Sequence, residues 1–130
     1  MDGYQDTLNA DTHRLYYRNC TIDFVFGNNL SLFQNCTFIT CKPDPKQGCM
    51  VTAQGRSDPK SNTAIIIQNS RFTAELAVLA AKPQVQAYLE CPWKELSRTI
   101  IMQSEIEGFI NCFEPCGCGW QPHRSNSLRW

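Results

Sequence analysis

Eight cysteines and two histidines are the side chains of this sequence with the most evident capacity for chemistry. The cysteines are Cys20, Cys36, Cys41, Cys49, Cys91, Cys112, Cys116 and Cys118, and the histidines are His13 and His123. Thiolates and imidazoles are the ligands that zinc prefers, so the last three cysteines together with His123 could form a zinc site. Their spacing, Cys-x3-Cys-x-Cys, is not that of a standard zinc finger, and such cysteines could equally form disulfides.

The cysteine content and three acceptor triplets bear on the compartment. Eight cysteines in 130 residues are many for a reduced cytosolic protein and few for a disulfide scaffold. Asn19, Asn29 and Asn35 begin glycosylation triplets, which favours secretion, although two of the triplets contain a cysteine, which suggests burial. The proline- and glycine-rich loop from Cys41 to Cys49 could be closed by its own two cysteines.

A four-residue repeat indicates which elements must position these side chains. An amide, a small residue, a variable residue and a large apolar residue recur in four segments that begin 16, 34 and 34 residues apart. The segments are Asn19-Cys20-Thr21-Ile22, Asn35-Cys36-Thr37-Phe38, Asn69-Ser70-Arg71-Phe72 and Gln103-Ser104-Glu105-Ile106. Short apolar runs with strand character accompany the copies, at residues 24–26, 30–33, 64–67 and 99–102.

Strands that recur with amides at matching positions predict a parallel β-helix, in which stacked Asn and Gln side chains hydrogen-bond from coil to coil. The alternative is an antiparallel sandwich with coincidental Asn turns, but no hairpin dipeptide separates the strands. We also expect a short helix within residues 75–87 that ends before Pro83. No linker divides the chain, so residues 1–130 are expected to form one domain.

Composition excludes several classes of function. The chain is 42% hydrophobic and 18% charged, with 12 basic and 12 acidic residues, which is typical of a folded segment. Zero net charge gives no electrostatic reason to expect a nucleic acid or an anionic membrane as partner. The apolar runs of the chain are too short to span a bilayer. The N-terminus lacks a signal-peptide pattern, so any export signal is expected outside this chain.

Four ordered motifs resemble those of plant pectin methylesterases over nearly the whole chain. They are Gly3-Tyr4-Gln5-Asp6-Thr7-Leu8, Asp23-Phe24-Val25-Phe26-Gly27-Asn28, Val51-Thr52-Ala53-Gln54-Gly55-Arg56-Ser57-Asp58-Pro59 and Pro92-Trp93-Lys94-Glu95-Leu96-Ser97-Arg98-Thr99. The resemblance implies an all-β, right-handed parallel β-helix, here a partial one. It also implies a secreted plant cell-wall enzyme that hydrolyses the methyl esters of homogalacturonan.

The resemblance further implies a set of site residues. Asp23 matches the carboxylate nucleophile, Asp6 the general acid and base, and Gln5 the amide that stabilises the oxyanion. Tyr4, Phe24, Trp93 and Trp120 match aromatic positions near the cleft, where their faces could stack on sugar rings. No metal or other cofactor is implied, and the motifs give the two histidines no role, so both are expected to be surface or loop side chains.

The chain departs from the family pattern near the expected nucleophile. The family has an arginine that holds this aspartate, where the present sequence has Cys91, and Glu90 adds a negative charge. The segment between Cys20 and Asp23 is also several residues shorter than usual. The alternative to an active pectinesterase is therefore a weak or inactive pectin-binding fragment. The expected partners are pectin and a proteinaceous pectinesterase inhibitor, with neither nucleic acid nor membrane, in the extracellular cell wall.

Overall fold

The computed structural model describes residues 8–9, 14–43, 49–81 and 85–111. These residues form thirteen short strands and one short helix, with strand partners that are distant in sequence. Every strand pair that the described residues form is parallel. The parallel β-helix predicted from the repeat is therefore confirmed, and the alternative prediction of an antiparallel sandwich is wrong.

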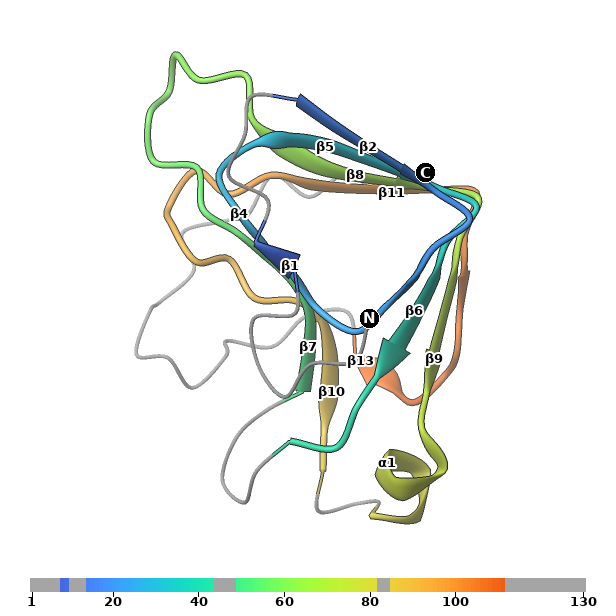
Figure 1. The fold of residues 1–130 in the computed structure, drawn as a ribbon. Coiled ribbons are helices and arrows are strands. Elements are labelled where there is room, and N and C mark those ends of the chain that lie inside the picture. Colours follow the sequence, from blue (N-terminus) through green and yellow to red (C-terminus); the bar gives the residue numbers. More distant parts are fainter. Residues whose placement is uncertain (1–7, 10–13, 44–48, 82–84, 112–130) are drawn as a thin grey trace.

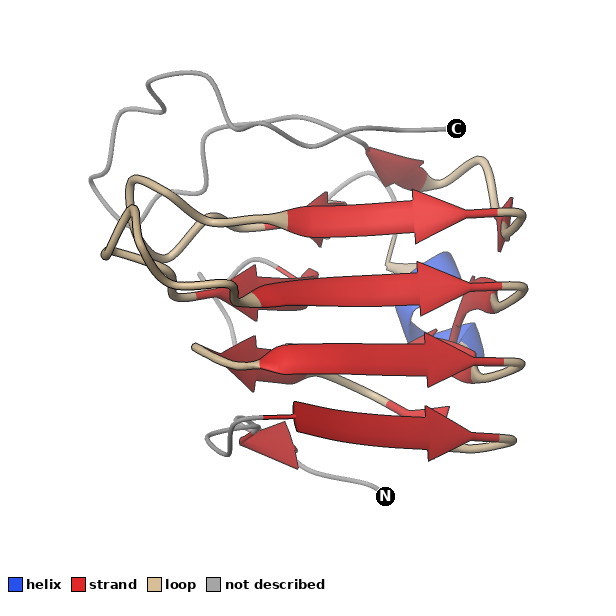
Figure 2. Ribbon diagram, turned by 90° about the horizontal axis from the view of Figure 1, so that it is seen from above, coloured by secondary structure: helices blue, strands red, loops and turns tan. Residues whose placement is uncertain are grey.

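Three sheets surround the interior, and the chain visits them in turn on each coil (Figure 1). Sheet A contains β1 (Leu8–Asn9), β4 (Val25–Gly27), β7 (Cys49–Gln54), β10 (Ala87–Glu90) and β13 (Ile110–Asn111). Sheet B contains β2 (Arg14–Arg18), β5 (Leu30–Gln34), β8 (Ala64–Gln68) and β11 (Thr99–Met102). Sheet C contains β3 (Thr21–Ile22), β6 (Thr37–Thr40), β9 (Arg71–Ala74) and β12 (Glu105–Ile106). Seen from the side, the coils lie one above another (Figure 2).

The turn between sheets B and C explains the amide of the repeat. Asn19, Asn35, Asn69 and Gln103 all have positive φ, between 49° and 55°. Asparagine tolerates this left-handed conformation better than most residues, and the reversal turns the chain sharply into the next strand. The amide side chains also bond from coil to coil, since Asn35 Nδ2 donates to Asn19 Oδ1 at 2.7 Å. The predicted amide stacking is thus present.

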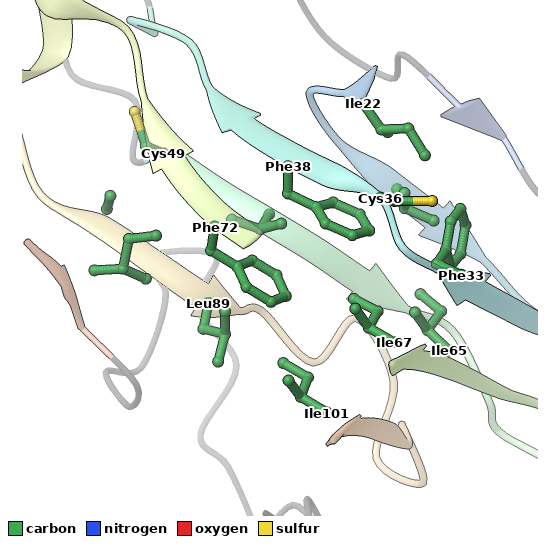
Figure 3. Close-up of a cluster of buried hydrophobic side chains, with 14 residues drawn as sticks. Ile22, Phe33, Cys36, Phe38, Cys49, Ile65, Ile67, Phe72, Leu89 and Ile101 are labelled. Carbon is green, nitrogen blue, oxygen red and sulfur yellow. The ribbon is translucent and has the colours of Figure 1, made fainter. Parts of the chain in front are cut away.

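The large apolar residue of each repeat points into the core. Ile22, Phe38 and Phe72 occupy one register across β3, β6 and β9, and none is exposed to solvent. The Phe38 and Phe72 rings stack with centroids 5.0 Å apart, and Phe33 meets Phe38 edge-on at 5.6 Å. Figure 3 shows these rings beside Ile65, Ile67 and Ile101 from sheet B. The sequence repeat is therefore a repeat of core layers.

Two irregular stretches were predicted with different success. The expected helix is present as α1 (Leu76–Ala80), which buries Val78. The loop after β6 is not closed by its cysteines, because Cys41 and Cys49 are both free thiols. The Cys49 thiol instead donates to the Cys41 carbonyl at 3.2 Å. Among the described helices, none is long and apolar enough to cross a membrane.

Candidate active site

The described part of the structure includes three of the seven predicted site residues. Asp23, Phe24 and Trp93 are described, whereas Tyr4, Gln5, Asp6 and Trp120 lie outside the described residues. The cysteines and histidine of the alternative zinc site also lie outside them, and so does His13. No group of three or more metal-ligating side chains occurs among the described residues.

Asp23 lies at the corner where the chain passes from β3 in sheet C to β4 in sheet A. Its carboxylate is beside two thiols, those of Cys41 and Cys49. The Cys41 thiol also donates to Glu75 Oε1 at 3.3 Å. Burial and the hydrogen bond to Glu75, together with the charges of Asp23 and Glu75, raise the pKa of Cys41 to about 12. Burial and the Asp23 charge raise the pKa of Cys49 to about 11. Both thiols therefore stay neutral near pH 7.

An aromatic surface follows directly from this corner along β4. The rings of Phe24 and Phe26 stack with centroids 5.8 Å apart because residues two apart in a strand share a face. Phe26 meets Trp93 edge-on at 6.4 Å. Trp93 is 54% exposed, and Lys94 Nζ lies 5.3 Å from the centroid of its ring. An exposed indole beside a cation can stack on a sugar ring and attract an acidic polymer.

Gly55 makes room for the Trp93 ring. A Cβ atom at this position would lie 2.8 Å from Trp93 Cε3, closer than side chains can approach. The glycine after β7 is therefore required by close packing. The β4 strand also ends in a glycine, Gly27, whose φ of 134° is one that other residues rarely adopt.

The segment that carries Trp93 is tied to the end of β7 by a buried polar network. The Gln54 side chain is fully buried, and its Oε1 accepts from the backbone N–H groups of Arg56 at 2.9 Å and Arg98 at 3.0 Å. The Gln54 carbonyl accepts from Trp93 N at 3.1 Å and from Ser97 Oγ. This network fixes the backbone on both sides of the indole.

Arg56 holds the neighbouring loop through its guanidinium. Its Nε donates to the Ser61 carbonyl at 2.8 Å, and its Nη2 donates to the Pro59 carbonyl at 2.7 Å. A third, longer bond joins Nη1 to the Leu96 carbonyl at 3.4 Å. Arg56 is thus engaged with backbone carbonyls and stabilises the loops around the aromatic surface.

Cys91 and Glu90 stand at the end of β10, in the next coil after β7. Cys91 is buried and disulfide-bonded, so it offers neither a charge nor a free thiol. Glu90 is 9% exposed, pairs in register with Thr52, and has no hydrogen-bond partner for Oε1. Burial raises the pKa of its carboxyl to about 7. The negative charge expected from Glu90 is therefore suppressed below that pH.

Comparison with known proteins decides the family. The pectinesterase family model matches residues 1–128. The chain belongs to the pectinesterase family. It is 49% identical over 126 residues to "Pectinesterase" of Petunia integrifolia, covering 94% of this chain and 32% of that protein. It is 44% identical over 126 residues to "Probable pectinesterase/pectinesterase inhibitor 58" of Arabidopsis thaliana, covering 94% of this chain and 21% of that one.

The solved structures agree with this assignment. "Pectin methylesterase from Carrot" superposes with a TM-score of 0.79 at 38% identity, covering 98% of this chain and 38% of that chain. A pectin methylesterase from Aspergillus niger superposes with a TM-score of 0.67 at 23% identity, covering 98% of this chain and 40% of that chain, which supports the fold. The chain thus spans about a third or less of the curated relatives described above. The predicted family and fold are both confirmed.

Several residues at this site were not predicted from the sequence. Phe26 joins Phe24 to Trp93, and the spacing of two between the phenylalanines was the available signal. The two thiols beside Asp23 could not be predicted, because the corner packs residues that are 18 and 26 positions away along the chain. Burial of Asn29, which is 1% exposed, rules out a glycan there in the folded chain.

Proposed function

We propose that this pectinesterase-family chain hydrolyses methyl esters of homogalacturonan by way of a covalent acyl-enzyme. The Asp23 carboxylate attacks the ester carbonyl carbon, and the oxyanion that forms accepts a hydrogen bond from the Gln5 amide. Asp6 donates its proton to the departing methanol and then removes a proton from the water that hydrolyses the anhydride. The products are methanol and a free galacturonate, and no metal or cofactor takes part.

The observation that carries this proposal is the continuity of Asp23 with the aromatic surface. One chain segment holds the carboxylate and then Phe24 and Phe26, and Trp93 contacts the second ring. When a methyl ester of the polymer is bound at Asp23, the neighbouring sugars would lie against these rings. Lys94 adds a positive charge where a galacturonate carboxylate would pass.

A second candidate, weak or absent turnover with retained pectin binding, is favoured by Cys91. This residue is held in a disulfide at the position where the resemblance implies an arginine. A disulfide-bonded cysteine cannot supply the charge-assisted hydrogen bonds that an arginine would donate to a carboxylate. The aromatic surface does not depend on that arginine.

We further propose the extracellular cell wall as the location, with pectin and a proteinaceous pectinesterase inhibitor as partners. Two features support this location and these partners: the family assignment and the exposed aromatic surface that a polysaccharide or an inhibitor would cover. Neither a nucleic acid nor a membrane is proposed as a partner.

The test measures methanol release from highly methylated pectin and, separately, binding of the chain to pectin. Asp23→Asn should abolish release while leaving binding intact. Asp58→Asn, a change at an exposed loop aspartate, is the matched control and should alter neither.

Trp93→Ala should weaken binding, because it removes the exposed indole. Binding without release in the unmodified chain would favour the second candidate. Release that survives Asp23→Asn would overturn the mechanism.

A further inference from the structure

Strand β2 presents three exposed side chains on the outer face of sheet B. Arg14, Tyr16 and Arg18 alternate with the half-buried Leu15 and Tyr17, so the three exposed side chains share one face of the strand. Tyr16 is 57% exposed. Figure 2 looks onto sheet B from outside, and no described helix or loop crosses the middle of its strands. A ligand can therefore reach all three side chains together.

The two arginines of β2 carry positive charge that no acidic residue of sheet B balances. The described strands of this sheet contain neither an aspartate nor a glutamate. Among the residues that the structure describes, neither guanidinium has an ion-pair partner. On sheet C, by contrast, Arg71 Nη2 lies 3.1 Å from Glu107 Oε1, and Arg71 Nε lies 3.8 Å from Glu105 Oε2. The arginines of β2 are thus available to an anionic ligand.

Hydrogen bonds between side chains hold the Tyr16 phenol in place on this face. Tyr16 Oη donates to Gln34 Oε1 at 2.8 Å. The row continues across the next coils, since Gln34 Nε2 donates to Gln68 Oε1 at 3.4 Å. Gln68 Nε2 in turn donates to Gln103 Oε1 at 2.9 Å. An exposed ring that is already oriented loses little conformational freedom when a ligand packs against it.

The spacing along β2 indicates the kind of ligand. A strand rises about 3.3 Å per residue, so the Cα atoms of Arg14 and Arg18 are about 13 Å apart, with Tyr16 midway between them. A guanidinium forms paired hydrogen bonds with a carboxylate, and an aromatic ring packs against the apolar face of a sugar. A linear polymer with a carboxylate on each sugar supplies both groups repeatedly, whereas a single sugar cannot reach both arginines.

We propose that Arg14, Tyr16 and Arg18 form a second polysaccharide-binding site, which takes runs of de-esterified galacturonate. The arginines bind two carboxylates of the polymer, and an intervening sugar packs on Tyr16. This site lies on sheet B, apart from the aromatic surface formed by Phe26 in sheet A and Trp93 after β10. The inference rests on the proposed function for the identity of the polymer. Because a methyl ester carries no charge, the site selects the product of the proposed reaction over its substrate.

The experiment measures binding of the purified chain to polygalacturonate, which has no methyl esters. All variants are made in the unmodified chain and again in Trp93→Ala, which separates this site from the aromatic surface. In both backgrounds, Arg14→Gln and Arg18→Gln should each weaken binding about threefold, and the two together about tenfold. Tyr16→Ala should also weaken binding, whereas Tyr16→Phe should not, because it keeps the ring. Binding should weaken as the salt concentration rises.

Arg71→Gln is the matched control, because it removes one positive charge from an exposed strand position that two glutamates already balance. This change should leave binding unaltered. Equal losses in Arg71→Gln and Arg14→Gln would overturn the proposal, because binding would then follow net charge alone. Complete loss of binding in Trp93→Ala would also overturn it, since the polymer would then bind only at the aromatic surface.

Two other polymers test the chemistry of the ligand. Highly methylated pectin should show no loss of binding in the arginine variants, because it has few free carboxylates. Dextran sulfate, a polyanion without carboxylates, should bind more weakly than polygalacturonate, and equally tight binding would overturn the proposal. Methanol release plays no part in these readouts. A chain that binds polygalacturonate through β2 without releasing methanol would contradict the proposed hydrolysis and leave this second site standing.

Discussion

Glu90 carries a buried carboxyl group whose titration should make the stability of the chain depend on pH. Burial raises its pKa from 4.5 to about 7. Between these values the folded chain keeps a proton that the unfolded chain has released. The contribution of Glu90 to the free energy of unfolding therefore falls as pH rises from about 4.5 to about 7 and is constant beyond both limits. A shift of this size corresponds to about 3 kcal/mol of unfolding free energy.

The perturbation that isolates this effect is Glu90→Gln, which keeps the shape of the side chain and removes its titration. Urea unfolding at about pH 4 and about pH 8 gives, for each protein, the change in unfolding free energy between these two pH values. The loss on going to the higher pH should be about 3 kcal/mol larger in the unmodified chain than in Glu90→Gln. Titration of the other carboxyl groups cancels in this difference. Equal changes in the two proteins would refute the reasoning, because Glu90 would then have the same pKa folded and unfolded.

Two further predictions concern the corner and the aromatic surface. Gly55→Ala should displace the Trp93 ring and cost about 1–3 kcal/mol of stability, with a change in Trp93 fluorescence. Gly108→Ala is its control, because nothing lies within 4 Å of a Cβ there; equal effects of the two changes would contradict the packing argument. Asp23→Asn should lower the pKa of Cys41, because it removes one of the charges that raise it. The Cys41 thiol should then react faster with an alkylating reagent at fixed pH, and an unchanged rate would show that the Asp23 carboxylate does not act on Cys41.

The fold could be predicted because each coil repeats the same local requirement. An amide residue in the left-handed conformation, a small residue and a buried apolar residue recur in the repeats that begin at Asn19, Asn35 and Asn69. Each of these requirements is visible in the residue type. The aromatic pair Phe24 and Phe26 was likewise accessible from strand alternation. Structural features that recur from coil to coil can thus be predicted from the sequence.

The surroundings of Asp23 could not be predicted for the opposite reason. The loop from Cys41 to Cys49 appeared suited to an internal disulfide, yet Cys41 hydrogen-bonds to Glu75 and Cys49 to the Cys41 carbonyl. Glu75 comes from the next coil, and the contact of Cys49 with the Cys41 carbonyl depends on how the corner between β6 and β7 turns. Corners vary in length from coil to coil, so sequence spacing does not determine their contacts.

The repeated core layers, and not the corners, keep the family fold in this chain. The bonded amides and the stacked core rings hold successive coils together, and neither set contains Glu90 or Cys91. These two residues join β10 to β7 through the backbone, since Glu90 pairs with Thr52 and Cys91 N donates to the Thr52 carbonyl at 2.9 Å. Backbone pairing depends little on the type of side chain, so these positions accommodate Glu90 and Cys91 while the coils stay in register. The proposed nucleophile Asp23 lies at the corner between β3 and β4, beside Cys41 and Cys49, so the proposed activity rests on that corner and not on the stacked core.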